Sequence, residues 1–353
     1  MHNTCKYFLL LIAFATTVAN AATYELPPEG SDVVGAISIV TTGFHDTLID
    51  IARRHDVGYQ DIVRANPEVN VWVPGEGTEV VLPTRYVLPA APRRGIVLNI
   101  AEYRLYYYPE PQGDEPAVVM TYPISIGRMD WETPIGTTKV ISKVVNPSWY
   151  PPQSVRDERA AEGRPLGRIV PPGPDNPLGE RAMRLALPGY LIHGTNRPAG
   201  VGMRVTHGCL RMFPEDIRYL FDRIAVNTRV RIINEPMKIG WHGDALVLEA
   251  HPLLASAPGK TTDEPLPDEP LADATKPDDA VAVPENPAEE TGENAAAEKN
   301  PLTLVTERFV VATAERAGEL DWSLVEVAIS RSDGMPVAVG AGIKNAATSA
   351  AFE

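Results

Sequence analysis

The apolar positions between residues 24 and 88 predict two short helices between two strands. Helical spacing is shown by Leu48, Ile51 and Ala52, and again by Ile62, Val63 and Ala65. Asp46 or Thr47 can serve as the N-cap of the first helix. Strands are expected over residues 35–40 and 79–82, so the pattern predicts a small β-α-α-β unit.

Residues 94–236 follow mainly strand patterns. The expected strands are a hairpin over 95–109, then 117–127, 136–145, 190–193 and 228–233. Pro134 and Gly136 predict a tight turn before the third of these segments. Pro214 then opens a helix with apolar residues at helical spacing: Ile217, Leu220, Phe221 and Ile224. A mostly β domain with one helix is expected, and residues 237–254 are interpreted as its extension.

Residues 146–177 interrupt this β pattern with a proline-rich stretch. About thirty residues without strand or helix periodicity exceed the usual length of a loop. Such a segment is either a lid or binding loop, or a loosely ordered surface insertion.

Residues 255–300 contain no aromatic residue and no regular apolar spacing, which predicts a disordered linker. Twelve acidic residues and three lysines give this linker nine of the fourteen net negative charges of the chain. The remaining residues are near neutral and show no basic patch, so nucleic-acid binding is not expected. Regular spacing of apolar residues returns over residues 301–340. There a strand-like stretch at 302–311 precedes an expected helix at 322–330.

The N-terminus reads as a secretory signal peptide over residues 1–21. An apolar run follows Lys6, and Ala19-Asn20-Ala21 supplies the small-x-small pattern of a cleavage site. This run is about half of the roughly 20 residues that span a bilayer, and no later segment is long and apolar enough. The mature chain is therefore expected to be exported, without stable insertion in a membrane.

Cleavage removes Cys5 and leaves Cys209 as the only cysteine, within the sequence Thr206-His207-Gly208-Cys209. A lone thiol outside the cytoplasm cannot form an intramolecular disulfide, which makes a purely structural role less expected, although small buried cysteines are common. An imidazole within hydrogen-bonding distance would activate the thiol as a nucleophile. The spacing favours His207 as this base, and His193, at the end of an expected strand, is the second candidate.

A zinc site is the other chemistry that these residues allow. His193, His207 and Cys209 could supply the three protein ligands of a catalytic zinc ion. No Cys-x-x-Cys or His-Glu-x-x-His spacing accompanies them, so the pattern favours thiol chemistry without a metal or cofactor. Gly208 would also let the neighbouring backbone N–H groups point towards a developing oxyanion.

Two family resemblances add to this interpretation. Residues 24–88 resemble a LysM domain, a small glycan-binding module, through the stretches Asp-Thr-Leu at 46–48, Arg-Ala-Asn-Pro at 64–67 and Val-Leu-Pro at 81–83. Phe44 and His45 depart from that pattern as two extra residues in a loop that helps to line the sugar groove. Residues 94–236 resemble the YkuD-type L,D-transpeptidases through His193-Gly194-Thr195, Thr206-His207-Gly208-Cys209-Leu210-Arg211 and the segment Thr-Pro-Ile-Gly at 133–136.

The second resemblance implies a mainly β fold, a β-sandwich catalytic domain with a helix after the cysteine, and roles for the motif residues. Cys209 would be the nucleophile and His193 the general base, oriented by the carbonyl of Gly194. His207 and Gly208 would shape the motif and its oxyanion site. Substrate contacts are implied for Arg211, Thr195 and Thr206, with a salt-bridge role as the alternative for Arg211.

The resemblance also implies the reaction and its partners. The thiol would attack a tetrapeptide stem of peptidoglycan at meso-diaminopimelate and release D-alanine, and an amine would then take the acyl group. The expected acceptor is the C-terminal lysine of a Braun-type outer-membrane lipoprotein, and the expected location is the periplasm. The alternatives are a second stem, which gives a 3-3 cross-link, water as the acceptor, a non-catalytic wall-binding scaffold, or an ordinary cysteine protease, whose local motifs are absent.

Overall fold

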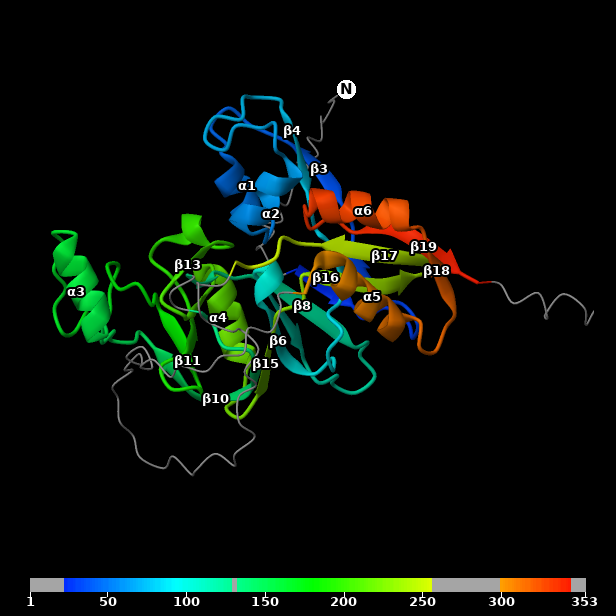
Figure 1. Cartoon of the computed structure of the whole chain (residues 1–353). Coiled ribbons are helices and arrows are strands. Elements are labelled where there is room, and N and C mark those ends of the chain that lie inside the picture. Colours follow the sequence, from blue (N-terminus) through cyan, green and yellow to red (C-terminus); the bar gives the residue numbers. More distant parts are fainter. Residues whose placement is uncertain (1–21, 129–131, 256–298, 344–353) are drawn as a thin grey trace, which may run out of the picture.

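The computed structural model describes residues 22–128, 132–255 and 299–343. The predicted signal peptide, most of the predicted acidic linker and part of the turn before Pro134 lie outside these residues. Figure 1 shows an N-terminal unit in blue, a central β unit in cyan and green, and a C-terminal sheet in yellow to red. Within the described ranges, no helix has the length and apolar character needed to cross a membrane.

The N-terminal unit has the predicted β-α-α-β order. Its elements are β2 (Val33–Gly35), β3 (Ser38–Thr41), α1 (Leu48–Arg54), α2 (Tyr59–Ala65), β4 (Glu79–Leu82) and β5 (Arg85–Val87). Thr47 caps α1 in a capping box with Asp50. The strand predicted over 35–40 is in fact two short strands, because the chain bends at Gly35, whose φ is +74°. Strand β2 therefore pairs with β5, whereas β3 pairs with β4.

A nine-stranded sheet forms the central unit, in the order β1-β8-β7-β6-β15-β10-β11-β12-β14. Its strands are β1 (Ala22–Glu25), β6 (Gly95–Asn99), β7 (Arg104–Tyr108), β8 (Val118–Pro123), β10 (Gly136–Val145), β11 (Arg181–Leu185), β12 (Leu191–His193), β14 (Leu210–Arg211) and β15 (Arg229–Ile233). A 3₁₀ turn (Ile100–Glu102) joins β6 to β7, and a parallel pair, β9 (Ile126–Gly127) and β13 (Arg204–Thr206), lies beside the sheet.

Strand β10 connects the two halves of this sheet. Its residues 136–139 pair with β15, and its residues 140–145 pair with β11, with an irregularity in the register between Val140 and Ser142. The two halves share one core, which also takes the apolar face of helix α4 (Pro214–Arg223). The mainly β fold with a helix after the cysteine, as predicted, is confirmed.

The proline-rich excursion is more ordered than its sequence pattern suggests. It contains helix α3 (Gln153–Ala161), and its two ends meet where Trp149 pairs with Val170. Asn176 is fully buried there, and its side-chain amide donates to the carbonyl oxygens of Pro147, Val170 and Pro171. One amide therefore holds several turns of this excursion together, a role that no local sequence pattern indicates.

The C-terminal residues build a third unit, a four-stranded sheet in the order β16-β17-β19-β18 with two helices. Its elements are β16 (Met237–His242), β17 (Ala245–Ala250), α5 (Pro301–Ala312), β18 (Gly318–Leu320), α6 (Trp322–Arg331) and β19 (Val337–Gly342). Residues 237–254 were expected as an extension of the catalytic domain; within them, β16 pairs with β17, and β17 pairs with β19. The strand expected over 302–311 was wrong, because this stretch forms α5. Asn300 caps that helix, Pro301 opens it, and Val305, Phe309 and Ala312 share its buried side at helical spacing.

The N-terminal unit packs directly on the loop that leads to Cys209. The N–H groups of Tyr59 and Gln60, at the start of α2, donate to the carbonyl oxygens of Val201 and Gly202 at 3.0 and 3.3 Å. Arg53 of α1 also forms a bidentate ion pair with Glu215 of α4 at 2.7 and 2.8 Å. The unit thereby braces both sides of the cysteine segment.

Candidate active site

Cys209 lies at the start of β14, the last strand of the central sheet. Strand β14 runs parallel to β12, with Ile192 opposite Leu210 and His193 opposite Arg211. Continuing this register by one residue brings Cys209 beside Leu191, and the two side chains pack together with Leu178. Because residues 191 and 193 of a strand face the same side, the thiol and the imidazole of His193 lie on one face of the sheet.

The orientation of His193 is fixed by the backbone that follows it. Its Nδ1 lies 2.6 Å from the carbonyl oxygen of Gly194, so the carbonyl accepts the Nδ1 proton of the neutral ring. A side chain on Gly194 would approach Ile217 of α4 to 3.1 Å, which leaves little room for one. This contact is the one that the motif resemblance implied for Gly194.

Burial keeps both His193 and Cys209 uncharged, and the thiol of Cys209 donates to the carbonyl of Gly189 at 3.5 Å. Burial is the largest influence on His193 and, with the nearby charge of Arg211, lowers its pKa to about 3, against the opposing carbonyls of Gly194 and Leu178. The same burial raises the pKa of the Cys209 thiol to about 11, although the charge of Arg211 partly offsets this. The resting site therefore holds a thiol and a neutral imidazole rather than a thiolate–imidazolium pair.

His207, which sequence spacing favoured as the base, is engaged elsewhere. Its Nε2 lies 3.0 Å from Oε2 of Glu158 on helix α3. The same carboxylate also accepts from both terminal nitrogens of Arg128, at 2.8 and 3.2 Å. Hydrogen bonds from Arg128 and His207 lower the pKa of Glu158 to about 2, so it is ionised at neutral pH.

Hydrogen bonds from two threonine hydroxyls hold the turn between β13 and Cys209. Thr206 donates through its hydroxyl to the carbonyl of Cys209 at 2.6 Å, and Thr133 donates to the carbonyl of Gly208 at 3.0 Å. Gly208 has a φ of +94°, and a side chain there would come within 3.0 Å of the ring of Tyr190. Glycine is therefore required both for this backbone angle and for the close packing on Tyr190.

Arg211 brings a positive charge close to the thiol. Its side chain is half-buried, and its Nε has no hydrogen-bond partner among the described residues. Burial is the largest influence on its pKa and lowers it. Thr195 is also buried, and its hydroxyl accepts from the N–H of Arg197 at 2.9 Å. The structure thus brings Arg211 to the thiol, whereas Thr195 supports the loop after His193.

Sequence reasoning did not identify Tyr190 or Glu158. Tyr190 donates to the carbonyl of Glu132 at 3.1 Å, and its pKa is raised to about 12 by burial and by its proximity to Cys209 and Glu132. The position of Tyr190, directly before the strand that ends in His193, was the available signal. Glu158 gave no signal, because its partners lie far from it in the sequence.

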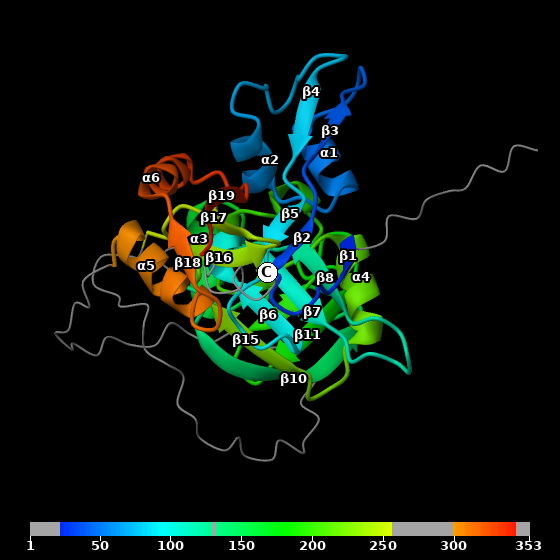
Figure 2. The same cartoon turned by 90° about the vertical axis from the view of Figure 1, so that its right-hand side faces the viewer.

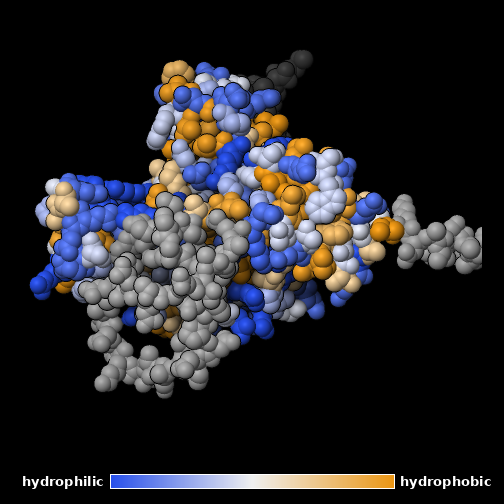
Figure 3. Space-filling view, viewed as in Figure 1, coloured by the Kyte–Doolittle hydropathy of each residue, from blue (hydrophilic) through white to orange (hydrophobic). Residues whose placement is uncertain are grey.

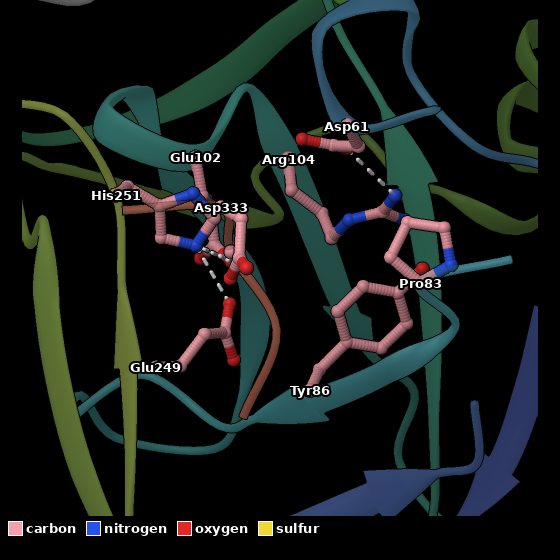
Figure 4. A pocket seen from close by; sticks show the side chains of 9 residues that line it. Asp61, Pro83, Tyr86, Glu102, Arg104, Glu249, His251 and Asp333 are labelled. Atoms are coloured by element: carbon pink, nitrogen blue, oxygen red, sulfur yellow. Dashed lines mark hydrogen bonds and ion pairs between the residues drawn. The ribbon is translucent and has the colours of Figure 1, made fainter. Parts of the chain in front are cut away.

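A separate group of ionisable side chains is buried at the junction of the three units (Figure 4). Oxygen or nitrogen atoms of Glu102, Glu249 and His251 lie within 4.8 Å of one another, which is close enough for metal ligands. Lys238 Nζ lies among them, 2.5 Å from Glu102 and 2.8 Å from Glu249. The lysine ammonium therefore already supplies the positive charge that a cation would bring. Neither Cys209 nor His193 lines the small cavity beside this group.

Comparison with known proteins identifies the family. Residues 93–232 match the model of the L,D-transpeptidase catalytic domain, YkuD. The probable L,D-transpeptidase YcfS of Escherichia coli is 41% identical over 269 residues, which cover 73% of this chain and 82% of that protein. The probable L,D-transpeptidase ErfK/SrfK of Salmonella typhimurium is 35% identical over 97% of this chain and 99% of its own length.

Among solved structures, L,D-transpeptidase 3 from Mycobacterium tuberculosis is 19% identical, with a TM-score of 0.29 over 60% of this chain and 97% of that chain. The two bacterial relatives by sequence extend well beyond the catalytic domain, and the catalytic-domain match includes both His193 and Cys209. The chain therefore belongs to the YkuD family of L,D-transpeptidases and is an enzyme that acts on peptidoglycan.

Proposed function

We propose that Cys209 is the nucleophile of this enzyme and that His193 is its general base. The observation that carries the proposal is the placement of both groups on one face of the sheet, with Nδ1 of His193 held by the carbonyl of Gly194. Because Nδ1 carries the proton in this arrangement, Nε2 is the basic nitrogen that would accept the proton of the thiol.

The first step is acylation of the thiol. Sγ of Cys209 attacks the carbonyl carbon at the L-centre of meso-diaminopimelate while Nε2 of His193 takes the thiol proton. The backbone N–H groups of residues 207–209 stabilise the negative charge that develops on the carbonyl oxygen. The peptide bond to D-alanine then breaks, the proton passes from His193 to the departing amine, and a thioester remains.

The second step transfers the acyl group to an amine. A neutral amine attacks the thioester carbonyl, loses a proton to His193, and releases the thiol of Cys209 as the new amide forms. We propose the C-terminal lysine of an outer-membrane lipoprotein as the physiological amine. The side-chain amine of diaminopimelate on a second stem would give a 3-3 cross-link through the same chemistry.

Arg211 is proposed to hold a carboxylate of the substrate. A half-buried guanidinium whose buried Nε lacks a partner among the described residues favours an anionic ligand, and both peptidoglycan stems and a lipoprotein C-terminus carry carboxylates. Thr195 and Thr206 are proposed to complete the substrate site by fixing the loops on either side of Cys209. Their own hydroxyls are occupied by backbone partners.

The N-terminal unit is proposed to be a LysM-like module that binds glycan strands. The β-α-α-β order supports this, as do the exposed aromatic side chains of Phe44 and Trp72. Figure 3 shows that apolar residues also gather on the surface of this unit. Aromatic rings exposed in this way suit contact with sugar rings, and Phe44 belongs to the loop that departs from the family pattern. The predicted signal peptide supports export, and we propose the periplasm as the location.

The test is intact-protein mass spectrometry of the mature enzyme and its Cys209→Ala variant. Each is mixed with a disaccharide-tetrapeptide and two competing acceptors, a second muropeptide and a peptide that ends in lysine. We expect a Cys209-dependent acyl adduct with release of D-alanine, followed by preferential coupling to the lysine peptide. Preferential coupling to the muropeptide would assign 3-3 cross-linking instead, and hydrolysis alone would assign a carboxypeptidase.

A folded wild-type enzyme that forms no adduct on authentic diaminopimelate stems would exclude Cys209 as the nucleophile and favour a wall-binding scaffold. Glycan binding is tested separately, by sedimentation with purified peptidoglycan sacculi. Phe44→Ala and Trp72→Ala should each reduce the bound fraction. Trp322→Ala is the matched control, because it removes an exposed aromatic ring from helix α6, outside the N-terminal unit. Equal binding by all three variants would remove the glycan assignment of these two residues.

A further inference from the structure

The backbone nitrogen of Ala22 lies at an acidic site. Ala22 is the first residue of β1 and pairs with Thr121 at the edge of the central sheet, on the side where α4 lies (Figure 2). Its N–H donates to Oδ2 of Asp56 at 3.2 Å. The predicted signal-peptide cleavage falls directly before this residue, after Ala19-Asn20-Ala21. The atom in contact with Asp56 is therefore the one that becomes the α-amino group of the mature chain.

Two buried carboxyl groups form this acidic site. Asp56 follows α1 and Asp216 lies in the first turn of α4, and their exposed fractions are only 7% and 3%. The two carboxyl groups hydrogen-bond to each other. Oδ2 of Asp216 has no partner among the described residues. Burial raises the pKa of Asp56 to about 6, and burial together with the charge of Asp56 raises the pKa of Asp216 well above its usual range.

The surroundings leave the site short of positive charge. The ionisable groups around the pair are Arg104 of β7, Asp61 of α2, Arg53 of α1, Glu215 of α4, Tyr24 of β1 and Tyr122 of β8. The guanidinium of Arg104 is 3.5 Å from Asp61, and Arg53 is committed to Glu215. Each of these two cations thus has another carboxylate as its ion-pair partner, and a buried carboxylate without a counter-charge is unfavourable.

We propose that Asp56 and Asp216 form a binding site for the α-ammonium group that signal-peptide cleavage creates on Ala22. A peptide N–H offers one donor and no net charge, whereas an ammonium offers three donors and a full positive charge. The ammonium can keep its contact with Asp56 and direct further donors to the unpartnered oxygen of Asp216. It also brings a positive charge directly to the pair of carboxyl groups.

Processing would therefore complete the fold of the enzyme. The site joins β1, the end of α1 and the first turn of α4, which begins five residues after Cys209. Removal of the signal peptide would strengthen the contact between the N-terminal unit and the segment that carries the thiol. This inference depends on the predicted cleavage after Ala21 and is independent of the roles proposed for Cys209 and His193.

The first test determines the mature N-terminus and the pKa of its amine. The full chain is exported by a bacterial host, and Edman sequencing is expected to begin at Ala22. The rate of acetic anhydride labelling is then measured against pH on the N-terminal peptide of the folded enzyme. We expect the α-amine pKa to lie at least one unit above the ordinary range of about 7.7–8.0. An ordinary value in the folded enzyme, or a different first residue, would overturn the proposal.

The second test compares two chain starts in two backgrounds. Chains that begin at Ala22 or one residue earlier, at Ala21, are prepared with Asp56 or with Asp56→Asn. At pH 7 the added residue should raise the unfolding equilibrium constant about tenfold with Asp56, the factor that one pKa unit represents. With Asp56→Asn the difference between the two starts should vanish. Asp222→Asn is the control. It removes an exposed carboxylate from α4, the helix that carries Asp216, and should keep the tenfold difference.

The pH dependence has a defined sign. An ammonium whose pKa is raised in the folded state stabilises the protein fully below the pKa of the unfolded chain. This stabilisation is lost as the pH rises through the folded pKa, so the two chain starts should become equally stable in strong base. If Asp56→Asn fails to fold, the comparison of the two starts with Asp56 intact still decides, because equal stability at pH 7 would contradict the proposal.

Discussion

Oε2 of Glu158 lies 3.0 Å from Nε2 of His207, so the histidine nearest to Cys209 in the sequence is tied to helix α3. The same carboxylate holds Arg128, at the end of β9 and the start of the segment that leads to Thr133. One side chain of the proline-rich excursion therefore connects that excursion to both segments that support the thiol. The excursion also reaches the thiol through an apolar contact, because Trp149 packs against the cluster of Leu178, Leu191 and Cys209.

Loss of this carboxylate should impair acylation more than stability. Glu158→Gln keeps the size of the side chain but removes the charge that pairs with Arg128. Because partly exposed ion pairs contribute about 0–1 kcal/mol, we expect a change in unfolding free energy below about 1 kcal/mol. The acylation rate, measured by mass spectrometry, should fall several-fold. Asp157→Asn, on the exposed side of the same helix, should leave both quantities unchanged, and an equal effect of the two variants would argue against a specific role of Glu158.

The thiol should react slowly with simple alkylating reagents at neutral pH. Burial raises the pKa of Cys209 to about 11, and the thiolate is the reacting form, so the alkylation rate should rise about tenfold per pH unit between pH 7 and 10. A thiolate–imidazolium pair would instead give a plateau in this range. Stopped-time iodoacetamide labelling followed by mass spectrometry distinguishes the two profiles.

The same protonation states predict a separation of two activities in His193→Gln. Its alkylation rate at pH 7 should stay within about twofold of the wild type, because the neutral imidazole does not generate a resting thiolate. Its acylation by a tetrapeptide stem should fall by about 10²–10⁴, the usual contribution of a general base. Parallel loss of both activities would show that His193 acts by lowering the thiol pKa.

The local elements of this fold could be predicted where capping and periodicity agree. Helix α1 begins at the residue after Thr47, and α4 starts at Pro214, as their sequence signals indicated. The strand prediction for residues 302–311 failed because the β-branched residues of this stretch favour a strand locally, while packing against β16 selects the helix. The pairing of β17 with β19, which the acidic segment separates in the sequence, could not be predicted. Nothing in residues 237–250 indicates that they pair with residues 337–341.

The candidate site shows the same limit. The motif placed Cys209, His193 and Gly194 together through family resemblance, whereas spacing alone favoured His207. Two residues on either side of a glycine can share a face of an extended strand, but Gly208 has a φ of +94° and turns the chain. The backbone angle at one glycine therefore breaks the strand alternation that favoured His207, and sequence spacing does not contain that angle.

Lys238 should be essential for stability. Its ammonium group is buried between Glu102 and Glu249, and removing it by Lys238→Met leaves two carboxyl groups without their counter-charge. Breaking a buried ion pair in this way costs about 3–5 kcal/mol, which chemical denaturation can measure. Lys299→Met, which removes an exposed ion pair with Glu307, should cost less than about 1 kcal/mol. Comparable losses for the two variants would contradict the assigned burial.

Gly202 should be required for the N-terminal unit to dock on the cysteine loop. A Cβ at this position would lie 2.4 Å from the backbone nitrogen of Tyr59 and 2.5 Å from Cα of Gly58, and its φ of +86° disfavours any side chain. Because both neighbours are backbone, they cannot rotate away, so Gly202→Ala should destabilise the enzyme by at least about 2 kcal/mol. Gly200→Ala, where the nearest atoms are 3.9 Å away, is the control in the same loop. Limited proteolysis between residues 24 and 88 should accelerate in Gly202→Ala alone, and unchanged protection would mean that the contact with α2 does not hold the unit in place.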